Sequence, residues 1–276
     1  MFRFPQLQEA ILLNRIDLGQ LQVVLPEGGI QLIRSAFQKL GPVEVLGTRI
    51  WFSPAPGPWT HQHIWELAEL DSGVLVCLNP ASVRAAVHHA LLHHQIPELV
   101  EYTPPQSEVL SQNFFMSGGK QPCMLAIEPV LHGDDIGRGF FPSAYDPTLE
   151  FRMRMLVQAQ LSGQRAVLLL AVPHQGIKNV FLSEHIDPQL GALLIDAHQR
   201  GLQILCYRIE VTTAALALKE AIDLKVIQIY KDSPDAPNVL KSSGVPTPDV
   251  PNQPHGLTQN VTDGTKPADP EAPSAA

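Results

Sequence analysis

The chain has 276 residues, of which 45% are hydrophobic and 17% are charged, so it is long enough to bury real cores and its composition excludes wholesale disorder. No apolar run approaches the roughly 18 residues that a membrane-spanning helix needs, and we expect no membrane partner. Its 19 Lys and Arg against 27 Asp and Glu give a net charge of −8. This argues against a broadly basic surface for nucleic acid, because such binding depends mainly on cations that neutralise phosphates.

The beginning of the chain and its cysteines indicate the compartment. Residues 1–5 lack the charged-then-apolar pattern of a signal peptide. Cys77, Cys123 and Cys206 are too few and too scattered for a disulfide scaffold or a zinc site. We therefore expect a reduced, cytoplasmic protein.

Short apolar runs separated by turn residues predict β-strands in residues 1–72. The runs lie at 21–25, 30–33 and 48–52, and Pro26–Gly29 is a turn. Several short strands at this spacing are typical of a small sandwich or barrel.

Residues 73–226 instead alternate strands with helices. The segment 165–172 is apolar on both faces and predicts a central strand. The alternation of strands and helices is typical of an α/β sheet. The expected strands are 74–78, 114–116, 123–127, 165–172 and 202–209, with a turn at Gly118–Gly119, and the expected helices are 80–94, 147–161, 188–200 and 213–221.

The last segment, residues 227–276, is rich in proline and has almost no periodic apolar pattern. Such a segment cannot bury enough surface to offset its chain entropy. We expect a disordered tail there.

An ordered set of short motifs over roughly residues 4–225 resembles the sugar fermentation stimulation protein family. No single motif is specific, but they occur in the family's order. They are Phe4, Leu7, Leu12, Leu13 and Arg15, followed by 63–67, 76–79, 96–99, 107–109, 139–142, 163–167, 186–187 and 201–207.

The resemblance implies a mixed α+β and α/β fold. Residues 1–72 would form a small OB-like β-barrel, and residues 73–226 a restriction-endonuclease-like, PD-(D/E)XK mixed-sheet domain. It also implies binding of DNA and, in some members, cutting of DNA or RNA with a divalent metal. In such a domain an Asp on one strand and a Glu-x-Lys on the next hold Mg²⁺ and steady the attacking water.

The residues at these family positions have changed. The Asp position is Phe114, or Asn113 if the alignment slips by one, and the Glu and Lys positions are Ala126 and Glu128. The family's Phe-Pro-Asp-Ala motif carries Ser143 in place of its Asp. We therefore predict an inactive nuclease site, no catalytic residue and no cofactor, with Mg²⁺ expected only if the site has been rebuilt.

Three acidic residues nearby are the weak candidates for such a rebuilt metal site. Glu108 precedes the first site strand, and Asp134 and Asp135 follow the second. One carboxylate binds a divalent cation weakly, and acids in loops are usually solvated, so we expect no metal there.

The sequence thus favours a scaffold that binds DNA or RNA without cutting it. The cations available on the barrel and at the edge of the former active site are Arg15, Arg34, Lys39, Arg49 and Arg84. Two alternatives stay open. One is a module that binds a protein partner or a second copy and has lost nucleic acid; the other is a metal-dependent nuclease with a rearranged site.

Overall fold

The computed structural model describes residues 1–17, 19–36, 45–54, 63–105, 113–143, 146–182, 184 and 187–226. These residues belong to one compact unit, Met1–Lys231. The tail expected to be disordered, residues 227–276, lies outside the described residues. No helix in the described ranges is long and apolar enough to cross a membrane.

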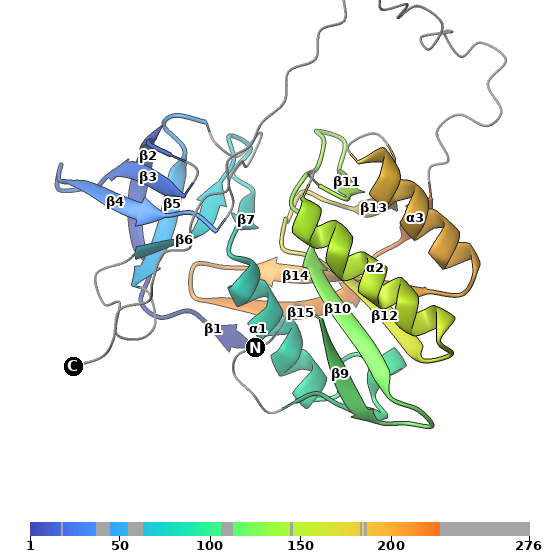
Figure 1. Cartoon of the computed structure of the whole chain (residues 1–276). Helices are drawn as coiled ribbons and strands as arrows, with labels where there is room; N and C mark the ends of the chain where they lie inside the picture. Colours follow the sequence, from blue (N-terminus) through green and yellow to red (C-terminus); the bar gives the residue numbers. More distant parts are fainter. Residues whose placement is uncertain are drawn as a thin grey trace, which may run out of the picture. The chain divides into compact units, whose positions relative to one another are not determined.

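A five-stranded barrel follows the start of the chain (Figure 1). Its strands pair in the order β4-β3-β2-β5-β6, and a parallel contact between β4 and β6, at Arg34 and Ile64, closes it. This pairing confirms the predicted OB-like barrel. The strands are β2 (Gln8–Arg15), β3 (Gln20–Val24), β4 (Ile30–Arg34), β5 (Arg49–Pro54) and β6 (His63–Glu69). A short strand, β7 (Leu75–Cys77), pairs with β6 antiparallel.

The rest of the described chain is built on a mixed sheet in the order β1-β15-β14-β12-β10-β9-β8. Strands β10, β12 and β14 are parallel, whereas β9 and β15 join them antiparallel. The strands are β1 (Phe2–Arg3), β8 (Tyr102–Thr103), β9 (Asn113–Gly118), β10 (Cys123–Pro129), β12 (Arg165–Val172), β14 (Gln203–Val211) and β15 (Ala215–Ala221). This confirms the predicted mixed-sheet α/β domain. Strand β1 pairs with β15, so the first residues of the chain belong to this sheet and not to the barrel.

A second, smaller sheet was not predicted. Strands β11 (Arg138–Phe141), β13 (Asn179–Leu182) and β16 (Leu224–Val226) run parallel to one another. Each is only three or four residues long, which leaves too little sequence for a period to be recognised.

Three α-helices begin in the same way, with a capping side chain followed by proline. Asn79, Asp146 and Asp187 each accept a hydrogen bond from a backbone N–H of the first turn, which satisfies an otherwise unpaired donor. Helices α1 (Pro80–Leu92), α2 (Pro147–Leu161) and α3 (Pro188–Gln199) confirm the predictions. A short 3₁₀ helix, η2, spans Pro97–Leu99.

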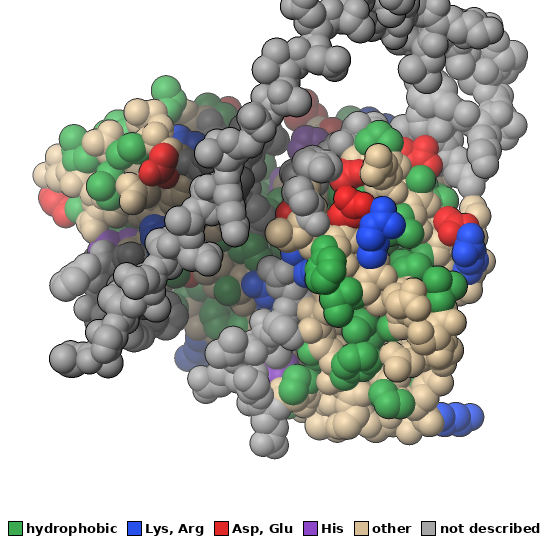
Figure 2. Space-filling model, viewed as in Figure 1, with side chains coloured by type: hydrophobic (Ala, Val, Ile, Leu, Met, Phe, Trp, Pro, Cys, Tyr) green, Lys and Arg blue, Asp and Glu red, His purple; other side chains and the backbone are tan. Residues whose placement is uncertain are grey.

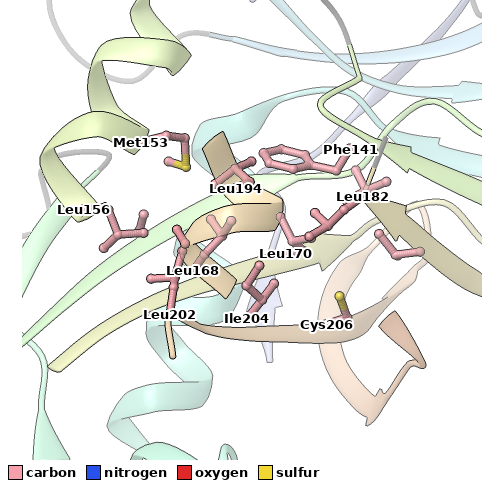
Figure 3. Close-up of a cluster of buried hydrophobic side chains, with 14 of the residues drawn as sticks. Phe141, Met153, Leu156, Leu168, Leu170, Leu182, Leu194, Leu202, Ile204 and Cys206 are labelled. Carbon is pink, nitrogen blue, oxygen red and sulfur yellow. The ribbon is translucent and has the colours of Figure 1, made fainter. Parts of the chain in front are cut away.

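The helices cover opposite faces of the central sheet. Side chains alternate along each strand, so Leu125 and Leu169 pack with α1, whereas Leu168 and Leu170 pack with α2 and α3. Figure 3 shows this second core, with Met153 and Leu156 of α2 and Leu194 of α3 directed at β12 and β14. Cys77, Cys123 and Cys206 are buried and free.

The predicted helix over 213–221 is wrong, because the segment forms strand β15. The Thr212 hydroxyl accepts the backbone N–H of Ala215 at 3.0 Å, and the backbone N–H of Thr212 donates to the Ala215 carbonyl at 3.1 Å. This tight turn sends the chain back along β14, where Leu216 is buried. Tertiary pairing has overridden the helix propensity of an alanine-rich run.

A buried carboxylate joins the barrel to the start of α1. Glu66 on β6 is only 4% exposed. It accepts hydrogen bonds from Ser53 Oγ at 2.7 Å, Asn79 Nδ2 at 3.0 Å and Ser82 Oγ at 2.7 Å. Since Ser53 lies on β5 and the other two donors lie at the start of α1, Glu66 is a structural residue.

Replacing Glu66 with Ala leaves these three donors buried without their acceptor. Since a buried unsatisfied group costs about 1–3 kcal/mol, we expect the free energy of unfolding to fall by about 2–4 kcal/mol, measured by urea denaturation. Glu27→Ala, in the exposed turn after β3, is the control and should change little. Equal stability of the two variants would contradict the role given to Glu66.

Candidate functional site

The hairpin of β9 and β10 carries the positions at which the family's metal ligands are expected. Asn113 pairs with Ala126, and Phe114 pairs with Leu125. Residues directly opposite each other point to the same face of a sheet. Asn113 is therefore on the face of Ala126 and Glu128, whereas Phe114 packs in the core beside α1. Of the two alignments considered, the register favours Asn113 as the residue at the Asp position.

Glu128 is held by an arginine from α2. Arg152 Nε donates to Glu128 Oε1 at 2.9 Å, and Arg152 Nη2 donates to Oε2 at 3.3 Å. The two side chains are 12% and 6% exposed, so this is a two-point ion pair shielded from water. We call Asn113, Glu128, Asp146 and Arg152 the β10 site.

The remaining contacts fix Arg152 at the start of α2. Its Nη1 donates to Thr148 Oγ1 at 3.0 Å, and its Nη2 lies 3.9 Å from Asp146 Oδ2. Asn113 Nδ2 donates to the Arg152 backbone carbonyl at 2.9 Å. The site thus ties β9, β10 and the first turns of α2 together.

Burial dominates the electrostatics of this site. Desolvation raises the pKa of Glu128, and the hydrogen bonds and charge of Arg152, with the charge of Arg84, oppose that rise. Desolvation also lowers the pKa of Arg84, which Glu128 opposes and Arg152 reinforces. A buried carboxylate needs hydrogen bonds or a cation to offset its lost hydration, and Arg152 supplies both to Glu128.

These residues do not fit a divalent metal. The family's two carboxylate positions are Asn113, a neutral amide, and Ala126, which has no ligand atom. The one carboxylate on this strand, Glu128, is already engaged by Arg152. Within the described ranges, no group of three or more His, Cys, Asp or Glu side chains is arranged to hold a metal ion.

The weak metal candidates lie elsewhere or outside the described residues. Asp134 accepts the backbone N–H groups of Ile136 and Arg138 and pairs with the Arg138 side chain at 2.6 Å, so it stabilises a turn. Asp135 beside it is exposed, and Glu108 lies outside the described residues. Ser143 donates from its Oγ to the Phe140 carbonyl at 2.9 Å, a local structural contact.

The candidate cations fall into two places. Arg84 lies on α1 and is partly buried, whereas Arg15, Arg34 and Arg49 lie on the barrel; Lys39 is outside the described residues. Arg49 pairs with Glu9 and Glu69, both at 3.3 Å. Arg15 Nη1 donates to the Asp17 carbonyl at 3.1 Å.

Arg34 lines a cavity of about 480 Å³ on the barrel, which the sequence did not predict. The cavity lies against β3, β4, the loop after β2 and the start of β6. His63 Nδ1 is buried here without a hydrogen-bond partner in the described structure, and burial lowers the pKa of this imidazole. The cavity is lined by Asp17, Gly19, Gln20, Leu32, Ile33, Arg34 and His63.

Arg152 is the residue of the β10 site that the sequence analysis missed. It lies three residues after Leu149 and one before Met153, both of which are buried, so it interrupts the apolar stripe of the helix. A charge on a buried helix face requires a buried partner, and this signal could have pointed to Glu128.

Removing the arginine leaves Glu128 charged and buried without a partner. We expect Arg152→Ala to lower the free energy of unfolding by about 3–5 kcal/mol, measured in urea. The control Arg154→Ala removes an exposed ion pair with Glu150 on the same helix and should cost about 1 kcal/mol or less. If Arg152→Ala costs no more than the control, the buried pair is not holding α2 to β10.

Comparison with known proteins supports the fold and the family. Residues 82–215 match the family model described as the sugar fermentation stimulation protein RE domain. The fold is similar to a solved structure titled "The structure of Pyrococcus Furiosus SfsA in complex with Ca2+". The match has a TM-score of 0.71 at 15% identity and covers 82% of this chain and 98% of the other. As the motifs predicted, residues 82–215 match this family, and the fold is similar to that of an SfsA protein.

Proposed function

We propose that this protein binds nucleic acid in the cytoplasm and does not cut it. The observation that carries the proposal is the Glu128–Arg152 ion pair, which stands with Asn113 and Ala126 where a metal-dependent nuclease needs free carboxylates. The fold of a nucleic-acid enzyme is retained, while the side chains needed for metal chemistry are replaced.

The barrel supports the proposed binding of nucleic acid. OB folds bind oligonucleotides on the face of their second and third strands and on the adjoining loops. Here those strands are β3 and β4, and the cavity with Gln20, Arg34 and His63 lies on them. Arg15 and Arg34 lie at the same end of this sheet, because Arg15 pairs with Leu21 and Arg34 with Gln20.

The net charge of −8 limits binding to a few local contacts. The affinity should therefore depend on salt with a small slope, since each neutralised phosphate contributes about 0.9 to it. A protein with a broadly basic surface would lose affinity much more steeply.

The test uses the full chain with a labelled DNA duplex and a labelled single strand. At about 50 and about 200 mM salt, with Mg²⁺ or with EDTA, we expect salt-sensitive binding and intact DNA under every condition. Arg34→Gln should weaken binding, whereas Arg200→Gln, an exposed arginine paired with Asp196 on α3, should not.

Two results would contradict the proposal. Cutting that requires Mg²⁺ would indicate a working nuclease with a rearranged site. An absence of binding even at low salt would exclude nucleic acid as the ligand.

A second candidate function is association with another copy of this chain through the outer face of α2. Phe151 is 65% exposed and Met155 43%, and Figure 2 shows apolar side chains gathered over this helix. Glu150 and Arg154 flank them, so two antiparallel copies of α2 would oppose unlike charges. Absence of DNA binding together with a sedimentation mass of two chains would favour this candidate.

A further inference from the structure

A cavity of about 660 Å³ lies where the chain leaves the mixed sheet and enters the barrel. It is bordered by β1 and the residues that follow it, by the beginnings of β2 and β5, and by the turn between β14 and β15. A cavity of this volume is typical of a site for a small ligand. It shares no residue with the β10 site or with the cavity beside Arg34.

The floor of this cavity is apolar and partly buried. Phe4, Leu7 and Trp51 line the cavity and also pack against the core that contains α1. Ile50 and Phe52, on either side of Trp51, belong to the core of the barrel instead. Since side chains alternate along a strand, the indole of Trp51 points out of the barrel, where an aromatic ring can serve as a platform for a flat ligand.

The rim of the cavity is polar and carries a cation. Arg3 is exposed, and in the part of the chain that the structure describes no hydrogen bond or ion pair holds its guanidinium. Glu9 also lines the cavity, but its carboxylate pairs with Arg49 at 3.3 Å, which partly compensates its charge. The rim therefore favours an anion beside Arg3, and a guanidinium fork matches the oxygens of a phosphate.

The floor and the rim together describe the chemistry of a ligand. It should have a flat ring for the apolar floor and a phosphate for Arg3, and a nucleotide has both. Bases in a duplex are stacked on one another, whereas the bases of a single strand are free to stack on a protein side chain. A nucleotide in a single strand is thus the form that fits this cavity.

We propose that this cavity binds one nucleotide of a single-stranded nucleic acid, with its base stacked on Trp51 and its phosphate at Arg3. This inference rests on the proposed function and adds a preference for single strands over duplexes. The contact is separate from the one proposed at Arg34, because Glu9 lies at the start of β2 and Asp17, in the other cavity, lies after its end.

The first experiment compares a labelled single strand with a duplex of the same sequence, using the full chain. Trp51→Leu keeps an apolar side chain but removes the ring, so it should weaken single-strand binding about tenfold and leave duplex binding unchanged. Trp51→Phe keeps an aromatic ring and should retain most of the single-strand affinity. Phe115→Leu, at a half-exposed phenylalanine on β9, is the matched control and should change neither.

The second experiment replaces the cation, and it does not depend on whether the Trp51 variants fold. Arg3→Gln should weaken single-strand binding severalfold near 0.1 M salt and reduce the slope of log K against log salt by about 0.7. Arg3 is exposed and makes no bond within the described residues, so the urea unfolding transition should stay where it is. Arg200→Gln is the control and should leave affinity and slope unchanged.

Tryptophan fluorescence separates a nucleotide in a strand from a free one. A single strand should quench the wild-type emission, and Trp51→Phe should abolish that part of the quenching. Adenosine monophosphate at the same nucleotide concentration should quench little, because it lacks the contacts made by the rest of a strand. Quenching by adenosine monophosphate that equals quenching by the strand would overturn the assignment to a strand.

The remaining outcomes separate this inference from the proposed function. If the wild type binds DNA and both Trp51→Leu and Arg3→Gln bind single strands as tightly as it does, the inference is wrong and the proposed function stands. An equal loss of duplex and single-strand affinity in Trp51→Leu would also overturn the stacked base. If the wild type binds no nucleic acid at low salt, both are wrong.

Discussion

The buried carboxylate of Glu128 constrains how helix α2 packs on strand β10. It lies on a central strand with almost no exposure to water, and Arg152 supplies the cation that makes this tolerable. Because Arg152 is held in turn by Thr148 and lies close to Asp146, the ion pair fixes the beginning of α2 against β10. Under the proposed function, this pair lies where an active nuclease of the family would coordinate its metal.

The register of β9 and β10 determines which side chains lie opposite each other on the face of Glu128. An Asp and a Glu on paired positions of one sheet face would converge on a metal ion. Here the paired residues are Asn113 and Ala126, a neutral amide and a methyl group, neither of which can serve as a carboxylate ligand. Glu128, two residues further along, has Arg152 as its partner, so an ion pair holds this face of the sheet to α2.

A second polar centre supports the barrel in a different way. Glu66 has three neutral hydrogen-bond donors where Glu128 has a cation. Both carboxylates lie in strands and bond to the first turns of a helix, so each strand-to-helix packing depends on satisfying one buried acid. The apolar cores hold the helices against the sheets. The two buried carboxylates, Glu66 and Glu128, then determine which residues of each helix face the strand.

Much of the fold could be predicted because its signals are local. An Asn or Asp before a proline marked the start of α1, α2 and α3, and an apolar run without polar alternation marked β12. The residues after Thr212 favour a helix by their propensity, and only their pairing with β14 makes them a strand.

The site was predictable only in part. The changed residues Ala126 and Glu128 can be identified from motifs. The choice between Asn113 and Phe114 required the pairing register, and the partner Arg152 lies 24 residues from Glu128. Contacts across that separation, and the cavity beside Arg34, arise from tertiary packing that no local pattern reports.

The most direct measurement of the central claim is a calorimetric titration of the full chain with Mn²⁺, comparing the wild type with Glu128→Gln. If the ion pair has replaced the metal centre, the two proteins will give the same titration, with no stoichiometric site that depends on Glu128. One Mn²⁺ bound per wild-type chain and lost in Glu128→Gln would show that this carboxylate is a metal ligand and would contradict the account.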